Sequence, residues 1–432
     1  MKHSFFHLFG ILLIVLCFFL AGCDNDDPND EQSADGTPAG DDDQAVDDDD
    51  DNDDDNNDDN DDDNDDDNDD NDDAFYPPDQ TGPYPVGVTT IYFTDESRWQ
   101  LWGLRYRELP LEIWYPSTGV GGVPNDMTAM VGDLPDWAWS VLGLVYGDYM
   151  DSLLAITTTA MRDAEPDTTD GPFPVIFFSH GISALRFQNF TLCEHLASHG
   201  FVVVAPDHYD GAIFTNIPGE AVILFNPATL VTGLIDRPPD VDFIYQSLLN
   251  LPQDGSLAAS IPLDLTIFGL SGHSYGGLTS MQVGPEFDYI DAIAPLNPIF
   301  LDYYPPSFDK PFFMLQSDQD EIVGIGNDWT RGAFDQSNSD KKIHLLLKRG
   351  SHYSATDACQ LLPRWFIRPA NGCDNPERID PLLANYISYS YMTAFFKSVL
   401  MEDERYNDYL LVNHFPVELE LTTQWAETPA VN

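Results

Sequence analysis

A serine set between glycines is the residue of this chain best placed to act as a nucleophile. The stretch Gly272-His273-Ser274-Tyr275-Gly276 has the pattern G-x-S-x-G, with a β-like run at 265–268 before it and a helix-like run at 278–283 after it. In such a strand–turn–helix the flanking glycines allow a tight turn, and the serine hydroxyl projects at the helix N-terminus. We predict Ser274 as a nucleophile, and the amide of Tyr275 as a donor to a developing oxyanion.

A serine hydroxyl reacts poorly unless a base takes its proton, and that base needs a carboxylate to fix its tautomer. In chains with this turn, the acid and then the base follow the serine, each just after a strand. The predicted strand 312–316 leads to Asp320 at the usual position of the acid, with Asp318 as a nearby alternative. The predicted strand 343–347 leads to His352, which we predict as the base.

Four other histidines are interpreted as structural. His344 lies inside a predicted strand, and His195 and His199 lie on a predicted helix. His180 precedes the serine in the chain and is expected to form hydrogen bonds within its own loop. That loop follows a strand and comes before the first large helix, so we predict the amide of Ile182 as the second donor to the oxyanion.

Alternating strand-like and helix-like segments position these residues. Helix-like segments lie at 189–198 and at 240–249, the second with Asp240 as its N-cap after two prolines. Because strands alternate with helices, we predict an α/β fold with a mostly parallel sheet flanked by helices. The strand-like segments are 88–93, 109–114, 174–179, 201–205, 263–270, 290–294, 312–316 and 343–347.

Two apolar segments interrupt this alternation, at about 126–158 and 213–234. The first has apolar residues at near-helical spacing, and the second follows a strand. One interpretation is that both are helices that pack on the core. The other is that they form a helical cap over the active site and line an acyl or lipid pocket.

The first 22 residues are typical of a bacterial lipoprotein signal peptide. A short basic start precedes an apolar run at 8–20, which is too short to span a bilayer comfortably. Leu20-Ala21-Gly22-Cys23 then resembles a lipobox, and cleavage before Cys23 would leave that cysteine as the lipidated N-terminus. We therefore predict a protein anchored by lipid to a membrane of the cell envelope, on its periplasmic face or at the cell surface.

Much of the charge lies in one segment. The 432 residues include 74 acidic and 18 basic side chains, for a net charge of -56, which argues against a nucleic-acid partner. After Cys23, the segment 23–75 is mostly Asp and Asn, cannot bury apolar surface, and is predicted to be a disordered spacer before a domain at 76–432. It lacks the glycine and glutamate of a calcium loop, so no metal site is predicted there.

The cysteines also point to an oxidising compartment. Cys359 and Cys373 flank a polar loop just beyond the predicted base, and we expect them to form a disulfide that leaves Cys193 free. Two free thiols are the alternative. No Cys/His arrangement has the spacing of a zinc site, and neither a metal nor a cofactor is predicted.

Several stretches together resemble the plasma-type platelet-activating factor acetylhydrolase family and the related dienelactone-hydrolase-like esterases. The resemblance covers roughly 82–398, and it implies an α/β-hydrolase fold and calcium-independent hydrolysis of short or oxidised acyl esters, including those of phospholipids. The matching stretches are Gly82-Pro83-Tyr84-Pro85-Val86-Gly87, Glu112-Ile113-Trp114-Tyr115-Pro116, Phe178-Ser179-His180-Gly181, His195-Leu196-Ala197-Ser198-His199-Gly200-Phe201 and Gly272-His273-Ser274-Tyr275-Gly276-Gly277.

One departure from that family concerns the acid. In its eukaryotic members the acid follows the strand after the nucleophile, where this chain has Asn297. An amide cannot act as the acid, so the resemblance implies that Asp320 takes this role.

The residues and the resemblance together predict a secreted, lipid-anchored serine ester hydrolase that forms an acyl-enzyme. Its predicted partners are an ester or phospholipid substrate and a membrane. One alternative is a carboxylesterase or polyester hydrolase that acts on esters other than phospholipids. The other is a catalytically silent, acidic surface-binding protein.

Overall fold

The computed structural model describes residues 74–100, 105–209, 211–219, 222–299, 308–324, 326–362 and 372–426. They belong to the unit Phe75–Asn432, apart from Ala74. The predicted signal peptide, the lipidation site Cys23 and nearly all of the predicted spacer lie outside the described residues. Within these ranges, no helix combines the length and the apolar character that crossing a bilayer requires.

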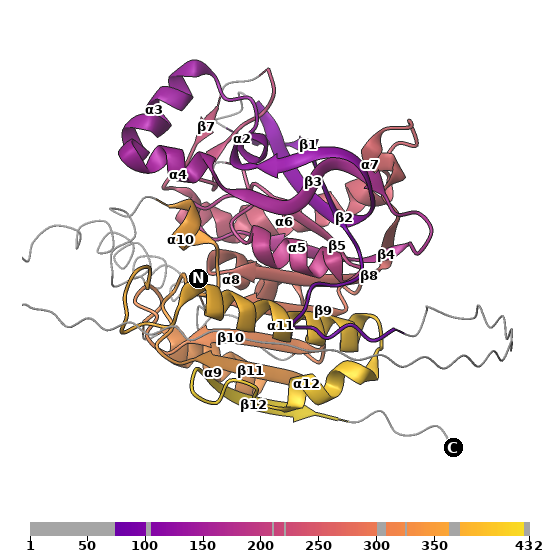
Figure 1. The fold of residues 1–432 in the computed structure, drawn as a ribbon, viewed down its shortest axis with the longest axis vertical. Helices are drawn as coiled ribbons and strands as arrows, with labels where there is room; N and C mark the ends of the chain where they lie inside the picture. Colours follow the sequence, from indigo (N-terminus) through magenta and orange to yellow (C-terminus); the bar gives the residue numbers. More distant parts are fainter. Residues whose placement is uncertain are drawn as a thin grey trace, which may run out of the picture. The chain divides into compact units, whose positions relative to one another are not determined.

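A ten-stranded sheet runs through the described part of the chain, in the order β1-β3-β2-β5-β4-β8-β9-β10-β11-β12 (Figure 1). The central strands β5, β4, β8, β9, β10 and β11 are parallel, whereas β2 and β12 pair antiparallel with β5 and β11. The strands are β1 (Val86–Gln100), β2 (Arg105–Asp126), β3 (Thr157–Pro166), β4 (Phe173–Ser179), β5 (Val202–Pro206), β8 (Leu263–His273), β9 (Ala292–Leu296), β10 (Phe312–Ser317), β11 (Lys341–Leu347) and β12 (Leu419–Trp425).

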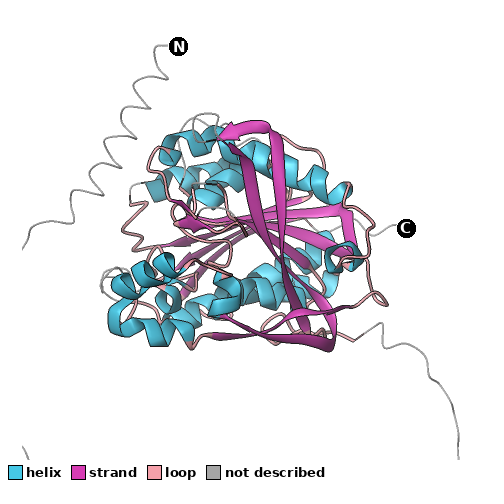
Figure 2. Ribbon diagram, turned by 90° about the horizontal axis from the view of Figure 1, so that it is seen from above, coloured by secondary structure: helices cyan, strands magenta, loops and turns pink. Residues whose placement is uncertain are grey.

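Helices cover both sides of this sheet (Figure 2). Apolar residues of α5 and α11 belong to one buried cluster, and those of α6, α8 and α9 belong to another. The described helices, with η for 3-10 helices, are α2 (Met127–Val131), α3 (Asp136–Tyr146), η3 (Gly147–Tyr149), α4 (Met150–Leu154), α5 (Phe190–Ser198), α6 (Thr229–Leu249), α7 (Leu257–Ser260), α8 (Tyr275–Val283), α9 (Gly326–Gln336), α10 (Ala358–Leu361), α11 (Pro381–Leu400), η5 (Glu404–Tyr406) and α12 (Asn407–Leu411).

Strand β4 shows why the sequences of the central strands are nearly continuous apolar runs. Successive side chains of a strand point to opposite faces of the sheet. Val175 and Phe177 belong to one buried cluster, and Ile176 and Phe178 belong to the other. Both faces of a parallel sheet are covered by helices, so every position of such a strand can be apolar. The predicted α/β architecture is confirmed.

Helix α6 begins earlier than predicted. It runs from Thr229 to Leu249 and contains Pro238 and Pro239, so Asp240 is not its N-cap. The Asp240 carboxylate is instead buried, and it accepts hydrogen bonds from Arg107 at 2.6 Å and from His208 at 2.8 Å. Asp240 therefore lies within α6, and its carboxylate is bound by residues far away in the sequence, which the local sequence does not reveal.

The two apolar insertions differ in structure. The first contains α2, η3, α3 and α4, and the Asp126 carboxylate caps α2 by accepting from the Ala129 amide at 2.8 Å. The second, 213–234, is helical only from Thr229 and contains two short antiparallel strands, β6 (Phe214–Thr215) and β7 (Ile223–Leu224). Pro218 and Gly219, which has a φ of 79°, lie between these strands and disfavour a helix there.

The segment that precedes β1 is bound to α5 through two histidines. The Nε2 atom of His195 donates to the Pro78 carbonyl, and that of His199 donates to the Gln80 carbonyl, each at 2.8 Å. Burial lowers the pKa of His195 to about 4 and that of His199 to about 3. Both rings are therefore neutral at physiological pH and join the start of the described chain to the core.

These two histidines should make the fold sensitive to acid. Their folded-state pKa values lie below the ordinary value for histidine. Their contribution to the free energy of unfolding is therefore fully present above about pH 6.5, and it decreases as the pH falls and the unfolded state binds protons. Each should contribute a slope of about 1.4 kcal/mol per pH unit between about pH 6 and pH 4.5. His195→Gln keeps an N–H donor for Pro78, and its unfolding free energy in urea should fall less steeply over this range. Equal slopes in the two proteins would contradict this assignment.

Candidate active site

Ser274 lies at the sharp turn between β8 and α8. Its φ of 56° is in the left-handed region, which is uncommon for a residue other than glycine. Its amide donates to the Leu296 carbonyl at 2.9 Å, and its carbonyl accepts from the Leu278 amide at 3.0 Å. These bonds tie the turn both to the neighbouring strand β9 and to the first turn of α8, which maintains the unusual backbone conformation.

The glycines beside this turn are required by close backbone contacts. A Cβ atom at Gly276 would lie 1.8 Å from the Ser179 carbonyl oxygen, at the end of β4. A Cβ at Gly272 would lie 2.6 Å from the same oxygen and from the backbone of Gly276. Only residues without a Cβ let the β8–α8 turn approach β4 this closely.

Asp320 and His352 form a buried pair. The Nδ1 atom of His352 donates to the Asp320 Oδ2 atom at 2.7 Å, and the Oδ1 atom accepts from the amides of Ile322 and Val323 at 2.9 and 2.8 Å. Burial alone would raise the pKa of Asp320, but His352 and these hydrogen bonds lower it below its ordinary value. The rival residue Asp318 is exposed. With Nδ1 donating, the Nε2 atom of His352 is left as the proton acceptor.

The loop that carries His352 is bound to the serine turn. The His352 carbonyl accepts from the His273 Nε2 atom at 2.8 Å and from the Asn297 side-chain amide at 3.1 Å. The centroids of the His273 and His352 rings are 4.7 Å apart. Ser274 directly follows His273, so the serine turn and the loop that carries His352 lie beside each other at the carboxyl edge of the parallel strands. Asn297 supports the backbone of His352 and is not bonded to its ring.

The loop predicted to supply an oxyanion donor lies against the serine. A Cβ atom at Gly181 would lie 3.6 Å from the Ser274 Cβ atom. The Gly181 amide donates to the Gln188 side-chain oxygen at 2.8 Å, whereas the Ile182 amide has no hydrogen-bond acceptor among the described residues. This leaves Ile182 N–H available beside the serine.

A chain of hydrogen bonds between neutral groups joins the loop at Gly181, the serine turn and the loop that carries His352. The Gln188 side chain, which accepts from Gly181, donates from Nε2 to the His273 Nδ1 atom at 2.7 Å. His273 in turn donates to the His352 carbonyl. Burial and the nearby His352 lower the pKa of His273 to about 3, so its ring is neutral and can accept at one nitrogen while it donates at the other.

His180 holds its own loop, as the sequence analysis expects. Its Nε2 atom accepts from the His208 amide at 3.0 Å, and its Nδ1 atom donates to the Gly181 carbonyl at 2.5 Å. Burial and the nearby cation of Arg237 place the pKa of His180 well below its ordinary value. The ring is therefore neutral and forms part of the scaffold behind the loop.

A second Ser–His–Asp set lies behind the same loop, and sequence reasoning did not identify it. The Ser179 hydroxyl donates to the His208 Nε2 atom at 2.8 Å, and the His208 Nδ1 atom donates to Asp240 at 2.8 Å. At most 1% of any of these residues is exposed, and Ser274, His352 and Asp320 are themselves buried, with 4%, 2% and 6% exposed. The Ser179 hydroxyl oxygen also lies 3.5 Å from the Arg237 Nη1 atom. No local pattern distinguishes these residues, because they come from β4, the segment after β5, and α6.

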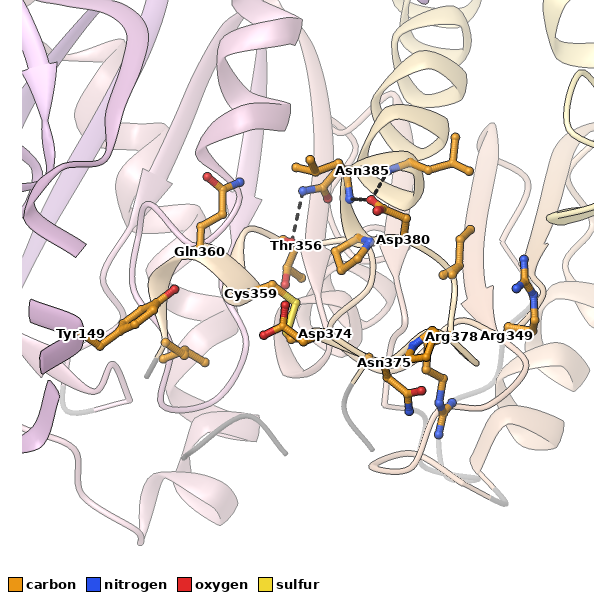
Figure 3. Close-up of a pocket in the computed structure, with 18 residues that line it drawn as sticks. Tyr149, Arg349, Thr356, Cys359, Gln360, Asp374, Asn375, Arg378, Asp380 and Asn385 are labelled. Atoms are coloured by element: carbon orange, nitrogen blue, oxygen red, sulfur yellow. Dashed lines mark hydrogen bonds between the residues drawn. A yellow bond between two sulfur atoms is a disulfide. The ribbon is translucent and has the colours of Figure 1, made fainter. Parts of the chain in front are cut away.

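Beyond the predicted base, Cys359 and Cys373 are joined by a disulfide, with 5.4 Å between their Cα atoms, and Cys193 is a buried free thiol. A hollow of about 740 Å³ lies beside this disulfide. Figure 3 shows the residues that line it, with Arg349 and Arg378 at one end. Ser274, Asp320 and His352 do not line it. In the part of the chain that the structure describes, no group of histidine, cysteine and acidic side chains could hold a metal ion.

Comparisons with known proteins match parts of this chain. The model of the family "Platelet-activating factor acetylhydrolase, isoform II" matches residues 73–220, and that of the family "Chlorophyllase" matches residues 158–288. Chlorophyllase-1 of Citrus unshiu is 28% identical over 130 residues, which span 30% of this chain and 33% of that protein. The platelet-activating factor acetylhydrolase of Cavia porcellus is 28% identical over 325 residues, which span 65% of this chain and 68% of that protein.

A putative carboxymethylenebutenolidase of Escherichia coli is 29% identical over 118 residues, which span 26% of this chain and 38% of that protein. Among solved structures, a ferulic acid esterase from Streptomyces cinnamoneus has a TM-score of 0.59 at 24% identity, with 74% of this chain and 91% of that chain covered. This structural likeness shows the fold alone. Together the matches confirm the resemblance found in the sequence: the chain has the fold of an α/β-hydrolase structure and is similar in sequence to the platelet-activating factor acetylhydrolases and to a dienelactone-hydrolase-like protein.

Proposed function

We propose that this protein is a serine ester hydrolase with Ser274 as nucleophile, His352 as general base and Asp320 as the acid that orients it. The observation that carries this proposal is the 2.7 Å bond from His352 to Asp320 on a loop that His273 binds to the serine turn. The relatives and the fold support an ester hydrolase of this kind.

In the proposed reaction, the Ser274 hydroxyl oxygen attacks the ester carbonyl carbon while the His352 Nε2 atom takes the hydroxyl proton. The carbonyl oxygen becomes an oxyanion, for which the amides of Ile182 and Tyr275 are the proposed donors. The tetrahedral intermediate then breaks its bond to the alcohol oxygen, which leaves with the proton from His352. Water hydrolyses the acyl-enzyme by the same steps, releasing the acid and restoring Ser274.

For the substrate, we propose short or oxidised acyl esters, including those of phospholipids. Similarity to the platelet-activating factor acetylhydrolases supports this choice. Helix α3 of the first insertion also leaves Trp137, Val141 and Leu144 exposed, to 51%, 50% and 85%. Exposed apolar side chains in one short helix are suited to contact with lipid, and we propose that this insertion caps the site.

Substitutions in the proposed triad should abolish ester hydrolysis. For p-nitrophenyl acetate, we expect Ser274→Ala and His352→Ala to lower kcat by about 10⁴-fold or more, and Asp320→Asn by about 10⁴-fold, because the amide favours the wrong histidine tautomer. Asp318→Asn is the matched control at the exposed neighbouring carboxylate and should keep activity within about twofold.

Reaction with a fluorophosphonate probe tests the nucleophile independently of substrate choice. The wild-type protein should be labelled and Ser274→Ala should not. If a folded Ser274→Ala variant is still labelled or still turns over ester, the proposed chemistry is wrong.

A substrate panel tests the proposed ester class. The purified protein should hydrolyse phosphatidylcholine with an acetyl or oxidised acyl chain faster than phosphatidylcholine with two long chains, because a capped pocket limits acyl length. If p-nitrophenyl and feruloyl esters are cleaved while every phospholipid is left intact, the enzyme acts on esters other than phospholipids, and the substrate proposal fails although the chemistry stands.

We also propose that the mature protein is attached to a membrane by lipid at Cys23. The lipobox-like stretch 20–23 motivates this, and two or more acyl chains give stable anchoring. In a bacterial host, the wild-type protein should fractionate with membranes, and Cys23→Ser should lose this attachment while Cys17→Ser keeps it. Equal membrane fractions for the wild-type and Cys23→Ser proteins would show that Cys23 is not the anchor.

A further inference from the structure

Arg237 on α6 is a buried cation bound to the loop beside the proposed nucleophile. Only 1% of it is exposed. Its Nη1 atom donates to the His180 carbonyl at 2.6 Å, and its Nη2 atom lies 3.4 Å from the Gly181 carbonyl oxygen. The Ser179 hydroxyl oxygen is 3.5 Å from Nη1. The described hydrogen bonds of this guanidinium therefore all go to one three-residue stretch of the loop.

The contact with Gly181 bears directly on Ile182. The Gly181 carbonyl and the Ile182 amide belong to the same planar, trans peptide group, so they point in opposite directions. Arg237 and the Nδ1 atom of His180 both donate to that carbonyl oxygen. Donors on the carbonyl side fix the orientation of the peptide and polarise its N–H, which makes the Ile182 amide a better donor.

The same guanidinium also contacts the residue that supplies the other proposed donor. The central carbon of Arg237 lies 4.7 Å from the centroid of the Tyr275 ring. The Tyr275 hydroxyl donates to the Leu230 carbonyl of α6 at 3.1 Å, and a Cβ at Gly233 would lie 3.0 Å from that hydroxyl oxygen. Tyr275, the first residue of α8, is thus held against α6 by stacking and by a hydrogen bond.

The charge of Arg237 is retained despite its burial. Burial lowers its pKa to about 10, so the side chain is a cation at neutral pH. The nearby carboxylate of Asp240 is already bound by Arg107 and His208. A fixed positive charge in a water-excluded site favours a transition state in which negative charge develops.

We propose that Arg237 is the positioning residue for both oxyanion donors: it orients and polarises the Gly181–Ile182 peptide from behind and aligns Tyr275 through its ring. This inference rests on the proposed function, because it assigns a role in the reaction of Ser274. It predicts an effect on transition-state stabilisation and not on the binding of the ground-state ester.

The test compares Arg237→Met with Arg237→Lys, measured as turnover of p-nitrophenyl acetate per active site titrated with a fluorophosphonate. Arg237→Met should lower kcat by about 10²-fold with KM within about twofold, as expected when an oxyanion donor is lost. Arg237→Lys keeps the charge but cannot donate to both the His180 and the Gly181 carbonyls in the same geometry, so its kcat should fall about tenfold. Binding of phenylboronic acid, which forms a tetrahedral adduct with serine, should weaken in the same order.

Lys342→Met is the matched control. The Lys342 ammonium is also a buried cation, donates to the carbonyls of Phe334 and Ser337 at 2.9 and 3.0 Å, and lies 5.1 Å from the centroid of the Phe334 ring. It is at the start of β11, the opposite end of that strand from His352. Its removal should lower stability but leave kcat per titrated site within about twofold.

Rescue separates positioning from folding. Arg237→Ala should recover at least tenfold in kcat with ethylguanidinium at millimolar concentration, and Lys342→Met should not respond. If kcat per titrated site in Arg237→Lys or Arg237→Met stays within twofold of wild type, or if KM alone changes, the proposal is overturned. If Ser274→Ala also remains active, the proposed function itself has failed, which is a distinguishable result.

Discussion

The close approach of the β8–α8 turn to the end of β4 is the constraint on which the site depends. The Ser179 carbonyl oxygen occupies the space that a side chain at Gly276 would fill. This contact places Ser274, which has a left-handed backbone conformation, beside the loop that begins at Ser179. Backbone packing within the sheet thereby positions the proposed nucleophile and the proposed oxyanion donors, before any side chain contributes.

Side-chain hydrogen bonds then connect the remaining loops to this turn. Gly181, Gln188, His273 and the His352 carbonyl form one continuous chain of donors and acceptors. Its histidine is neutral because burial lowers its pKa, so the chain carries no net charge that would need solvation. A buried network whose donors and acceptors are hydrogen bonded to one another makes the surrounding structure more rigid. The position of His352 relative to Ser274 therefore follows from bonds made by the residue before the serine.

The sequence predicts the parts of the site that depend on local pattern. G-x-S-x-G between a strand and a helix identifies the turn at Ser274, and chain order after strands indicates Asp320 and His352. Gln188, Arg237 and the Ser179–His208–Asp240 set escape such reasoning, because their roles arise from contacts between distant segments. For the same reason, the prolines before Asp240 suggest a helix start, whereas α6 begins at Thr229 and Asp240 pairs with Arg107 from within the helix.

The two Ser–His–Asp sets show that the hydrogen-bond pattern alone does not identify a nucleophile. Ser179 and Ser274 both lie at the end of a parallel strand near a histidine, but Ser179 is within β4 and fully buried, with Arg237 near its hydroxyl. Ser274 has the turn conformation that places its side chain at the start of a helix, beside the amides of Tyr275 and Ile182. A nucleophile needs oxyanion donors as well as a base. The Ser179 set therefore supports the other one, because it fixes the strand end and the loop against which the serine turn packs.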